Sequence, residues 1–411
     1  MMFSMGNLNA VDLFAGCGGL SLGLHKAGFQ GLFAIEKDPM AFETFHHNLI
    51  ADEATFRNFQ DWPSWLPKKP HDITSLLSEV GFTSKLTSLR GEVGLIAGGP
   101  PCQGFSLAGA RRPTDIRNRL FMSMLETVKL IRPRAVLIEN VVGITRPFSS
   151  TKGPKLSTAD EIVQLLENAG YAASWSIQEA TDFGVPQTRQ RVFILGVLDS
   201  LPFNPSDIFA TVRSSRSEFL SERGLPTANA VTAWEAISDL DNPSEQVPCP
   251  DSPLFNSSRY LPAQSAFQHL LRKDSKEYAI PDSHRFSRHG ERILNLYNTA
   301  LKTQPPGRLS KEFLLSMGTK KNKKFLIDKR KPVSTITTHP DEFIHYSHPR
   351  NITIREMARF QSFPDAFHFK GRYTVNGDRR QFDVPRCSQV GNAVPPMMAE
   401  ALGMTLKEAL D

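Results

Sequence analysis

The sequence predicts an α/β protein: a mostly parallel sheet with helices on both faces, joined to a second, smaller domain. Up to about residue 198, short apolar runs alternate with helix-periodic segments, which is the pattern of consecutive strand–helix units. Residues 199–260 then become rich in Pro, Ser and Asp and lose clear periodicity. We therefore place the first domain at 1–198, completed by 385–411, and the second domain with its hinge at 199–384.

The charge of the chain is unevenly distributed. Among 411 residues, Lys and Arg number 48 and Asp and Glu 42, so the formal net charge is +6. Between Lys302 and Lys331, however, ten basic residues stand against two acidic ones. Such a stretch is either a binding surface for a polyanion or an ordinary solvated surface. The first residues lack a leader pattern and no apolar run reaches membrane length, so we expect a soluble, cytoplasmic protein.

The four cysteines, at positions 17, 102, 249 and 387, are scattered and form no C-x-x-C pair. This spacing argues against a zinc site and against a disulfide scaffold, and it fits a reducing compartment. We therefore expect no metal.

The first strand–helix unit contains a glycine-rich turn. Residues 10–14 predict a strand and 20–27 a helix, and the turn between them has the spacing Gly16-x-Gly18-x-x-Ser21. Glycines there allow the backbone to approach a ligand closely, although simple turn chemistry explains them nearly as well. The next strand, 29–35, ends at Glu36, where an acid binds the ribose hydroxyls of an adenosine-type ligand in a Rossmann-like unit. The alternative is an acid at the start of the next helix.

A second apolar run, 93–97, leads into a rigid Gly-Gly-Pro-Pro turn that places Cys102 just past the end of a strand. In open α/β sheets this edge binds ligands. Residues 120–130 predict a helix, and a further strand, 134–138, ends at Glu139, which therefore faces the same edge. The alternative for Cys102 is an ordinary small, buried side chain. The alternative for Glu139 is a surface acid at the end of a strand.

Three further segments follow in this half of the chain. Residues 111–119 hold four arginines and one acid, and we interpret them as a mobile loop that closes over phosphates. Residues 160–169 predict a helix, which is followed by strands at 172–180 and 192–197. Gln187, Arg189 and Arg191 alternate and so share one face, either to hold an acceptor-rich partner or as a basic strand edge that discourages aggregation.

Six stretches, in this order, resemble the cytosine-C5 DNA methyltransferase family. They are Asp12-Leu13-Phe14-Ala15-Gly16 with Gly18-Gly19; Gly99-Pro100-Pro101-Cys102-Gln103-Gly104-Phe105-Ser106; Glu139-Asn140-Val141; Gln187-x-Arg189-x-Arg191; Arg355-Glu356-x-Ala358-Arg359-x-Gln361-Ser362-Phe363-Pro364; and Gln389-Val390-Gly391-Asn392-Ala393-Val394-Pro395-Pro396. The resemblance extends over the catalytic half of the chain. Residues 200–335 match no motif, as expected for a variable target-recognition region.

This resemblance implies a Rossmann-like methyltransferase sheet with a target-recognition domain, and a defined reaction. The thiolate of Cys102 adds to C6 of a cytosine, which makes C5 nucleophilic toward the methyl group of S-adenosylmethionine. Glu139 assists at N3 and the exocyclic amine, while Arg191, supported by Arg189, holds O2. The base must first be flipped out of double-stranded DNA. S-adenosylhomocysteine is the second product.

The resemblance also implies the binding residues. The cofactor site comprises Phe14, Ala15, Gly16, Gly18, Gly19, Glu36, Asp72, Ile73, Pro100, Leu120, Asn392 and Val394. For Asn392 and Val394 to close this pocket, the helix predicted at 397–410 must return to the first sheet. For DNA contacts we select Gln103, Ser106, Arg111, Arg112, Lys320, Lys321, Lys323 and Lys324. Cys17 is interpreted as a small turn residue rather than a second catalytic thiol.

The compact length resembles the bacterial restriction–modification type of this family. That type implies a monomer and a cognate restriction endonuclease acting as a separate protein. Three alternatives remain. A tRNA cytosine methyltransferase of the same family carries a Cys-Phe-Thr signature, where this chain has Ile336-Thr337-Thr338-His339-Pro340. The others are a non-catalytic DNA-binding homologue and a nicotinamide-dependent oxidoreductase.

Overall fold

The structure is a computed structural model. It describes residues 8–101, 118–147, 156–242, 245–275, 279–319, 323–374 and 383–411. Within this part of the chain, no helix is both long and apolar enough to cross a membrane.

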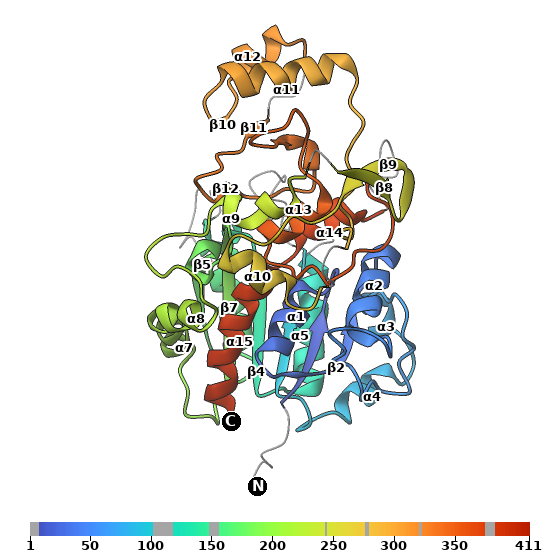
Figure 1. Ribbon diagram of the computed structural model, residues 1–411. Coiled ribbons are helices and arrows are strands. Elements are labelled where there is room, and N and C mark those ends of the chain that lie inside the picture. Colours follow the sequence, from blue (N-terminus) through green and yellow to red (C-terminus); the bar gives the residue numbers. More distant parts are fainter. Residues whose placement is uncertain are drawn as a thin grey trace. The chain divides into compact units, whose positions relative to one another are not determined.

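The chain divides into two compact units (Figure 1), each described here by itself. Unit 1 comprises Met1–Ala180, Gln190–Ser217 and Val394–Asp411, and unit 2 comprises Thr181–Arg189 and Glu218–Ala393. The expected boundary at residue 198 therefore lies at Ser217, and the closing segment begins at Val394 rather than at residue 385. Thr181–Arg189 leaves unit 1 because its residues bond to later parts of unit 2, which the local pattern does not show.

Unit 1 is built on a six-stranded sheet with the order β2-β1-β3-β4-β7-β5. Its strands are β1 (Asn9–Leu13), β2 (Gln30–Ile35), β3 (Leu95–Gly98), β4 (Ala135–Asn140), β5 (Tyr171–Glu179) and β7 (Gln190–Leu198). The first four are parallel, and β7 runs antiparallel between β4 and β5. The predicted mostly parallel sheet is thus confirmed. The central strands are continuous apolar runs because both of their faces are covered.

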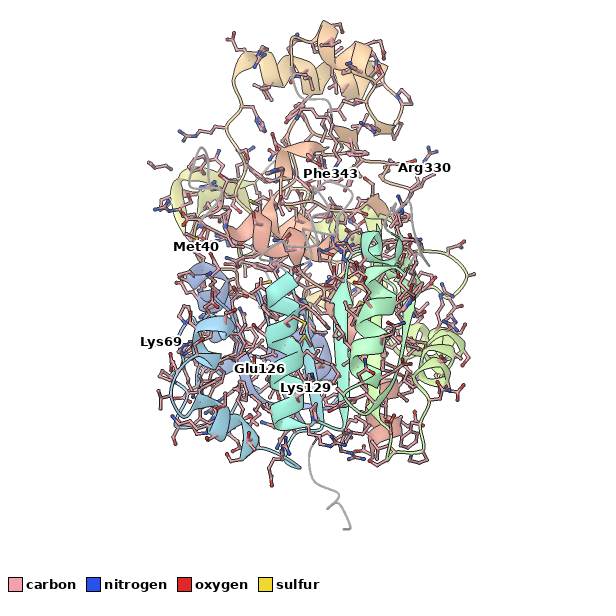
Figure 2. All side chains as sticks on the ribbon, turned by 180° about the vertical axis from the view of Figure 1, so that it is seen from behind. Met40, Lys69, Glu126, Lys129, Arg330 and Phe343 are labelled. Carbon is pink, nitrogen blue, oxygen red and sulfur yellow. The ribbon has the colours of Figure 1, made fainter. Side chains whose placement is uncertain are left out.

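Helices cover both faces of this sheet. They are α1 (Gly19–Lys26), α2 (Pro39–Phe45), α3 (Ile73–Leu77), α4 (Phe82–Thr87), α5 (Asn118–Ile131), α6 (Thr158–Glu167), α7 (Pro205–Ser214) and α15 (Pro396–Leu410), with the short helices η1 (His46–Ile50) and η2 (Val142–Thr145). Figure 1 shows α1 and α15 on the front face, and Figure 2 shows α5 on the back. There α5 buries Met124 and Val128 and turns Glu126 and Lys129 to solvent.

The last helix of the chain packs against the first. A Cβ atom placed on Gly23 of α1 would lie 2.4 Å from the carbonyl oxygen of Pro396 and 2.5 Å from Cβ of Ala399. Glycine therefore permits the two helices to approach at backbone distance. The expected return of the C-terminal helix to the first sheet is confirmed, and it brings the segment from Val394 onward into unit 1.

Unit 2 consists of short elements joined by long connections. It contains β6 (Gln187–Thr188), α9 (Ala233–Ile237), η4 (Ser238–Leu240), β8 (Gln246–Cys249), β9 (Ser252–Ser258), α10 (Ala266–Arg272), α11 (Glu291–Thr303), β10 (Gly307–Arg308), α12 (Lys311–Ser316), β11 (Phe325–Leu326), β12 (Val333–Ser334), η5 (Pro340–Glu342), β13 (Phe343–Ile344), α13 (Ile354–Phe360) and α14 (Arg386–Asn392). η3 (Ala180–Phe183) and α8 (Arg216–Glu222) lie across the unit boundaries.

Buried ion pairs fix α13 inside unit 2. The guanidinium of Arg359 is fully buried and pairs with the carboxylates of Asp239 and Asp365, at 3.0 Å and 2.6 Å from its Nη2. Both carboxylates hold the pKa of Arg359 above its ordinary value against the opposing effect of burial, which is the largest single influence. Removing one partner from such a cluster leaves a buried charge unpaired, so this part of the 355–364 stretch serves the fold.

Candidate active site

Glu139 and Arg191 meet at the carboxyl edge of the unit 1 sheet. Glu139 lies near the end of β4 and Arg191 near the start of the antiparallel neighbour β7. Nε of Arg191 donates to Oε1 of Glu139 at 2.8 Å, and the two side chains are only 14% and 11% exposed. Burial lowers the pKa of Arg191, and the Glu139 carboxylate opposes that change. The structure thus brings two predicted catalytic residues into one charged pair.

The turn that follows β3 is fixed beside this pair. Nδ2 of Asn140 donates to the carbonyl oxygen of Pro100 at 3.0 Å. A Cβ atom on Gly98 would lie 2.4 Å from the carbonyl oxygen of Leu13, and one on Gly99 would lie 3.2 Å from Oε2 of Glu139. The two glycines therefore let the β3 end pass between β1 and the Glu139 carboxylate. Asn140 is a positioning residue whose role the sequence did not reveal.

Several predicted residues fall outside the described ranges. These are Cys102, Gln103, Ser106, Arg111, Arg112, Lys320 and Lys321. Their roles stay predictions. The described chain stops at Pro101, one residue before the predicted nucleophile, on the strand edge that carries Glu139.

The glycine turn after β1 has the backbone conformation of a close-approach site. Phe14 and Gly16 have φ values of 61° and 56°, and Gly18, which precedes α1, has a φ of 99°. Apart from Gly16 and its two chain neighbours, no described residue has an atom within 4 Å of a Cβ placed on Gly16, so the described structure leaves space beside this backbone. In contrast, a Cβ on Gly18 would meet Leu49 at 2.7 Å. Ala15 and Gly19 are buried in the same turn.

Glu36 ties this turn to the end of β2. Its carboxylate accepts the backbone N–H of Gly16 at 2.8 Å through Oε2 and that of Asp38 at 2.6 Å through Oε1. Burial raises the pKa of Glu36 above its ordinary value. Each carboxylate oxygen has capacity for a further donor, so this arrangement is compatible with bound hydroxyl groups.

The segment around residue 72 lies beside the same strand end. The backbone N–H of His71 donates to the carbonyl oxygen of Glu36 at 2.8 Å, and Lys37 pairs with Asp72 at 2.8 Å. Asp72 also caps α3 by accepting the N–H of Thr74. The structure therefore brings Glu36 and Asp72 together, although α2, η1 and a long connection separate them along the chain.

The remaining cofactor candidates are divided between the units. Ile73, Pro100 and Val394 are buried and Leu120 is half-buried, all in unit 1. Asn392 is exposed at the end of α14 in unit 2.

Two titratable side chains near this turn, Asp12 and Cys17, are buried. Asp12 is 3% exposed; Oγ of Ser21 donates to its Oδ2 at 2.6 Å, and its Oδ1 has no hydrogen-bond partner among the described residues. Burial raises the pKa of Asp12 to about 7. In the sequence, Asp12 stands out as an acidic residue inside an apolar strand, but we assigned it no role. Burial also raises the pKa of Cys17 to about 12, so this thiol stays protonated and is a small turn residue.

Arg189 does not join Arg191. It is 1% exposed, and its Nη atoms donate to the carbonyl oxygens of Ile336, Gly391 and Ala393 at 3.2, 3.0 and 3.1 Å, all within unit 2. Gln187 is equally buried, bonded to Gln361 at 2.8 Å. The expected row of three donors on one face is therefore wrong, because the first two bind unit 2 and only Arg191 belongs to β7. We reassign Arg189 from catalysis to the fold.

The two described lysines among the DNA candidates differ. Lys323 is 46% exposed at its side chain and pairs with Glu342 at 3.1 Å. Lys324 is 2% exposed, and its ammonium donates to the carbonyl oxygen of Asp341 at 2.6 Å and to the Tyr297 hydroxyl at 3.3 Å. The expectation that Lys324 contacts DNA is corrected, because its charge is enclosed by unit 2.

The chain matches one family model and is similar to several named proteins. The model of the family described as C-5 cytosine-specific DNA methylase matches residues 8–408. The Type II methyltransferase M.DdeI of Desulfomicrobium norvegicum is 32% identical, covering 96% of this chain and 87% of that protein. The Type II methyltransferase M.AgeI of Thalassovita gelatinovora is 29% identical, covering 98% of this chain and 100% of that protein.

Solved structures show the same fold. A putative DNA modification methyltransferase encoded within an E. coli prophage has a TM-score of 0.66 at 24% identity, covering 98% of this chain and 99% of that one. The Dnmt2 methyltransferase of S. pombe has a TM-score of 0.51 at 16% identity, covering 98% of this chain and 100% of that one.

Proposed function

The chain belongs to the C-5 cytosine-specific DNA methylase family, and on that premise we propose that it transfers the methyl group of S-adenosylmethionine to C5 of a flipped-out cytosine in double-stranded DNA. The observation that carries this proposal is the buried Glu139–Arg191 pair at 2.8 Å, beside the turn that leads to Cys102. A carboxylate and a guanidinium at this edge match the polar side of a cytosine ring. The relatives support the modification half of a Type II restriction–modification system.

The nucleophile in this proposal is the thiolate of Cys102. Its addition to C6 forms a C–S bond and gives C5 the character of an enamine carbon. S-adenosylmethionine, when bound, supplies an electrophilic methyl group. Loss of the C5 proton then restores the C5–C6 double bond and expels the thiolate. No described side chain is assigned as the base for that step, and we propose water.

Glu139 and Arg191 stabilise the negative charge that the addition puts on the ring. Glu139, in its protonated form, donates to N3 and accepts from the exocyclic amine, and Arg191 donates to O2. Because Nε of Arg191 donates to Glu139 and Nη1 donates to the carbonyl oxygen of Gln190, Nη2 is the donor that faces substrate in this proposal. The pair thus holds two groups in fixed relative positions before the base arrives, which avoids reorganisation during the reaction.

The residues of the β1–α1 turn fit the cofactor. Among the described residues, none fills the space beside the Gly16 backbone and none bonds to Oδ1 of Asp12 beneath the turn, while Glu36 is anchored at the end of β2. We propose that Glu36 binds the ribose hydroxyls and that Asp72, Ile73, Pro100 and Leu120 border the adenine. Val394 and Asn392 would close the pocket from the C-terminal side.

The proposal is tested by bisulfite sequencing of DNA from a methylation-free host that expresses the chain. Protected cytosines in one recurring sequence context, absent with Cys102→Ser and with Glu139→Gln, are expected. The absence of protection despite folded, cofactor-binding protein would overturn the proposal. Transfer to tRNA but not to duplex DNA, with purified protein and radiolabelled cofactor, would instead favour the tRNA alternative.

A second experiment tests the covalent step. In a duplex with 5-fluorocytosine at the target position, C5 carries fluorine, so the last elimination cannot release a proton and the adduct persists. A stable protein–DNA complex is expected from the native chain and not from Cys102→Ser. If both proteins are trapped equally, Cys102 is not the nucleophile. Gel filtration of the same protein tests the expected monomer.

A further inference from the structure

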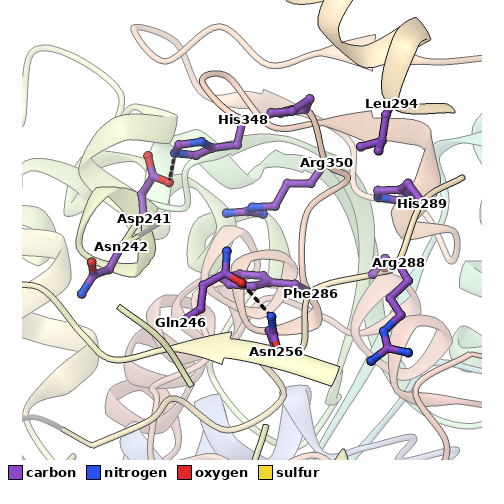
Figure 3. A pocket seen from close by; sticks show the side chains of 12 residues that line it. Asp241, Asn242, Gln246, Asn256, Phe286, Arg288, His289, Leu294, His348 and Arg350 are labelled. Atoms are coloured by element: carbon purple, nitrogen blue, oxygen red, sulfur yellow. Dashed lines mark hydrogen bonds and ion pairs between the residues drawn. The ribbon is translucent and has the colours of Figure 1, made fainter. Parts of the chain in front are cut away.

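Unit 2 contains a pocket whose lining includes none of the residues assigned to catalysis. Its volume is about 320 Å³. Its lining includes Asp241, His348 and Arg350. Figure 3 shows His348 and Asp241 on one wall, directed toward each other from two separate chain segments. Neither residue has a part in the proposed methyl transfer.

Three metal-type donors converge at this wall. Asp241 follows η4, and His345 and His348 follow β13 in an H-x-x-H spacing. One donor atom from each of the three lies within 4.8 Å of the others. Nε2 of His348 is 2.6 Å from Oδ1 of Asp241, and the two imidazole rings lie with centroids 5.3 Å apart.

The hydroxyl of Ser347 lies between two of these three residues, Asp241 and His345. Its Oγ donates to Oδ2 of Asp241 at 3.0 Å and lies 3.3 Å from Nδ1 of His345. A small polar group therefore already sits between a carboxylate and an imidazole nitrogen. The other contacts of that Nδ1 are long, 3.2 Å to the N–H of Ser347 and 3.3 Å to the N–H of His348.

The far side of the His345 ring faces the buried carboxylate of Glu356. The ring is fully buried, and its Nε2 makes no hydrogen bond within the described part of the chain. Oε1 of Glu356 lies 3.8 Å from this nitrogen, beyond hydrogen-bond distance. Glu356 is itself fixed by two bonds from Arg350, at 2.6 and 2.8 Å. A ligating imidazole commonly directs its second N–H at such a fixed carboxylate.

From this arrangement we propose that Asp241, His345 and His348 bind one divalent metal ion of the zinc class. The ligand atoms are a carboxylate oxygen, Nδ1 of His345 and Nε2 of His348. Two nitrogens and one oxygen suit Zn²⁺, whereas Ca²⁺ and Mg²⁺ prefer oxygen ligands in greater number. Because Asp241 and His348 are partly exposed toward the pocket, the fourth position is open to water or to a polar ligand there.

The ion would connect distant parts of unit 2. More than 100 residues separate Asp241 from the two histidines, and the ion would join the end of η4 to the loop after β13. It would thereby fix two walls of the pocket. None of the three proposed ligands is a cysteine, so the spacing of the cysteines in the sequence does not predict this metal site. The competing account is a purely hydrogen-bonded brace, in which Ser347, Asp241 and His348 hold the loop without metal.

Metal retention distinguishes these accounts. The full chain is treated with a chelator, dialysed against micromolar Zn²⁺, desalted and analysed for zinc by mass spectrometry. About one zinc per chain is expected for the native protein, as for a specific site. Asp241→Asn and His348→Gln should lose it, while the matched control His269→Gln, an exposed histidine on α10, should retain it. Zn²⁺ should raise the unfolding temperature only in the chains that retain it.

Two measurements on the native chain do not depend on variants that fold. Bound Co²⁺ should give tetrahedral visible bands without the near-ultraviolet charge-transfer band of a thiolate. In a ¹⁵N spectrum of the histidine rings, Zn²⁺ should shift Nδ1 of one ring and Nε2 of another. A failure to retain zinc, equal retention by His348→Gln, or a thiolate band with Co²⁺ would each overturn the proposal in favour of the brace or of a thiol site.

Discussion

At the residue scale, Arg191 is held by the Glu139 side chain, its one side-chain partner within the described residues. Its Nε–H bond to Glu139 orients the planar guanidinium, and its Nη1 donates to the backbone carbonyl of Gln190 at 2.7 Å. A guanidinium offers several donors in a fixed plane, whereas an ammonium is a single flexible point charge. The geometry therefore requires arginine specifically.

Arg191→Lys should lower kcat by about 10²- to 10³-fold, because lysine cannot bond Glu139 and present further fixed donors to the base. Binding of S-adenosylmethionine should change little, since the β1–α1 turn is untouched. Single-turnover methyl transfer and calorimetry measure the two quantities. Arg213→Lys, an exposed arginine of unit 1, is the control. A wild-type kcat in Arg191→Lys would contradict this role.

Asp12 should make folding stability depend on pH. Its pKa is raised from 3.8 to about 7, so the native state binds more protons than the unfolded state between these values. The contribution of Asp12 to the free energy of unfolding is therefore present at low pH. It is lost as the pH rises toward 7, by up to about 1.4 kcal/mol per pH unit. The groups facing Asp12 are Ser21, which stabilises its charge, and Glu36, which opposes it.

Asp12→Asn removes this titration while keeping an acceptor for Ser21. Urea unfolding at pH 5 and pH 7.5 should show the variant gaining stability relative to the native chain as the pH rises. A constant difference between the two proteins across this range would show that Asp12 stays ionised in the folded state.

The residue scale is also where sequence-based prediction was least complete. Glu139 and Arg191 were found because each lies at the end of a recognisable strand. Arg189 was misassigned because its three carbonyl acceptors are 147, 202 and 204 positions away, and spacing along the chain carries no sign of them. Lys324 was misassigned because a count of charges does not distinguish a buried ammonium from an exposed one.

At the element scale, the strands of unit 1 could be predicted closely. Apolar runs at 93–97 and 134–138 became β3 and β4 because buried parallel strands need apolar side chains on both faces. The helix at 397–410 was predicted one residue short of α15. Unit 2 could not be predicted in this way, since its strands β6, β10, β11, β12 and β13 have only two residues each and no period can be detected.

The contact between α1 and α15 should be sensitive to one methyl group. In Gly23→Ala the new Cβ would overlap the Pro396 carbonyl, which forces the two helices apart. We expect a loss of about 1–3 kcal/mol in unfolding free energy, although alanine favours isolated helices. Urea denaturation measures the change. Gly196→Ala in β7 is the matched control, because its nearest neighbour is 3.4 Å away. Equal effects of the two substitutions would contradict close helix approach.

At the scale of the whole molecule, the basic stretch 302–331 proves heterogeneous. Lys323 reaches solvent and Lys324 supports the interior of unit 2. Total charge therefore overstates the number of residues able to contact a phosphate. Composition correctly indicated a basic protein, but burial decides which of its charges are available to DNA.

Lys323→Gln should weaken binding to duplexes of any sequence and reduce the salt dependence of binding by about one unit of slope. Lys324→Gln should lower the unfolding temperature and leave the salt slope unchanged, because it removes the bonds to Asp341 and Tyr297. Fluorescence anisotropy across a salt series and thermal unfolding measure both effects. The reverse pattern would place Lys324, and not Lys323, at the DNA.

The order in which unit 1 is made on the ribosome follows from the packing of α15 on α1. Its sheet emerges early, yet the helix that covers α1 is translated only after Glu218–Ala393. At ordinary elongation rates that interval lasts roughly 10–35 s. Throughout it, the apolar face of α1 lacks its cover and the pocket lacks Val394. A nascent chain thus has a long window in which chaperones can engage it, and a message cut short within unit 2 yields no competent enzyme.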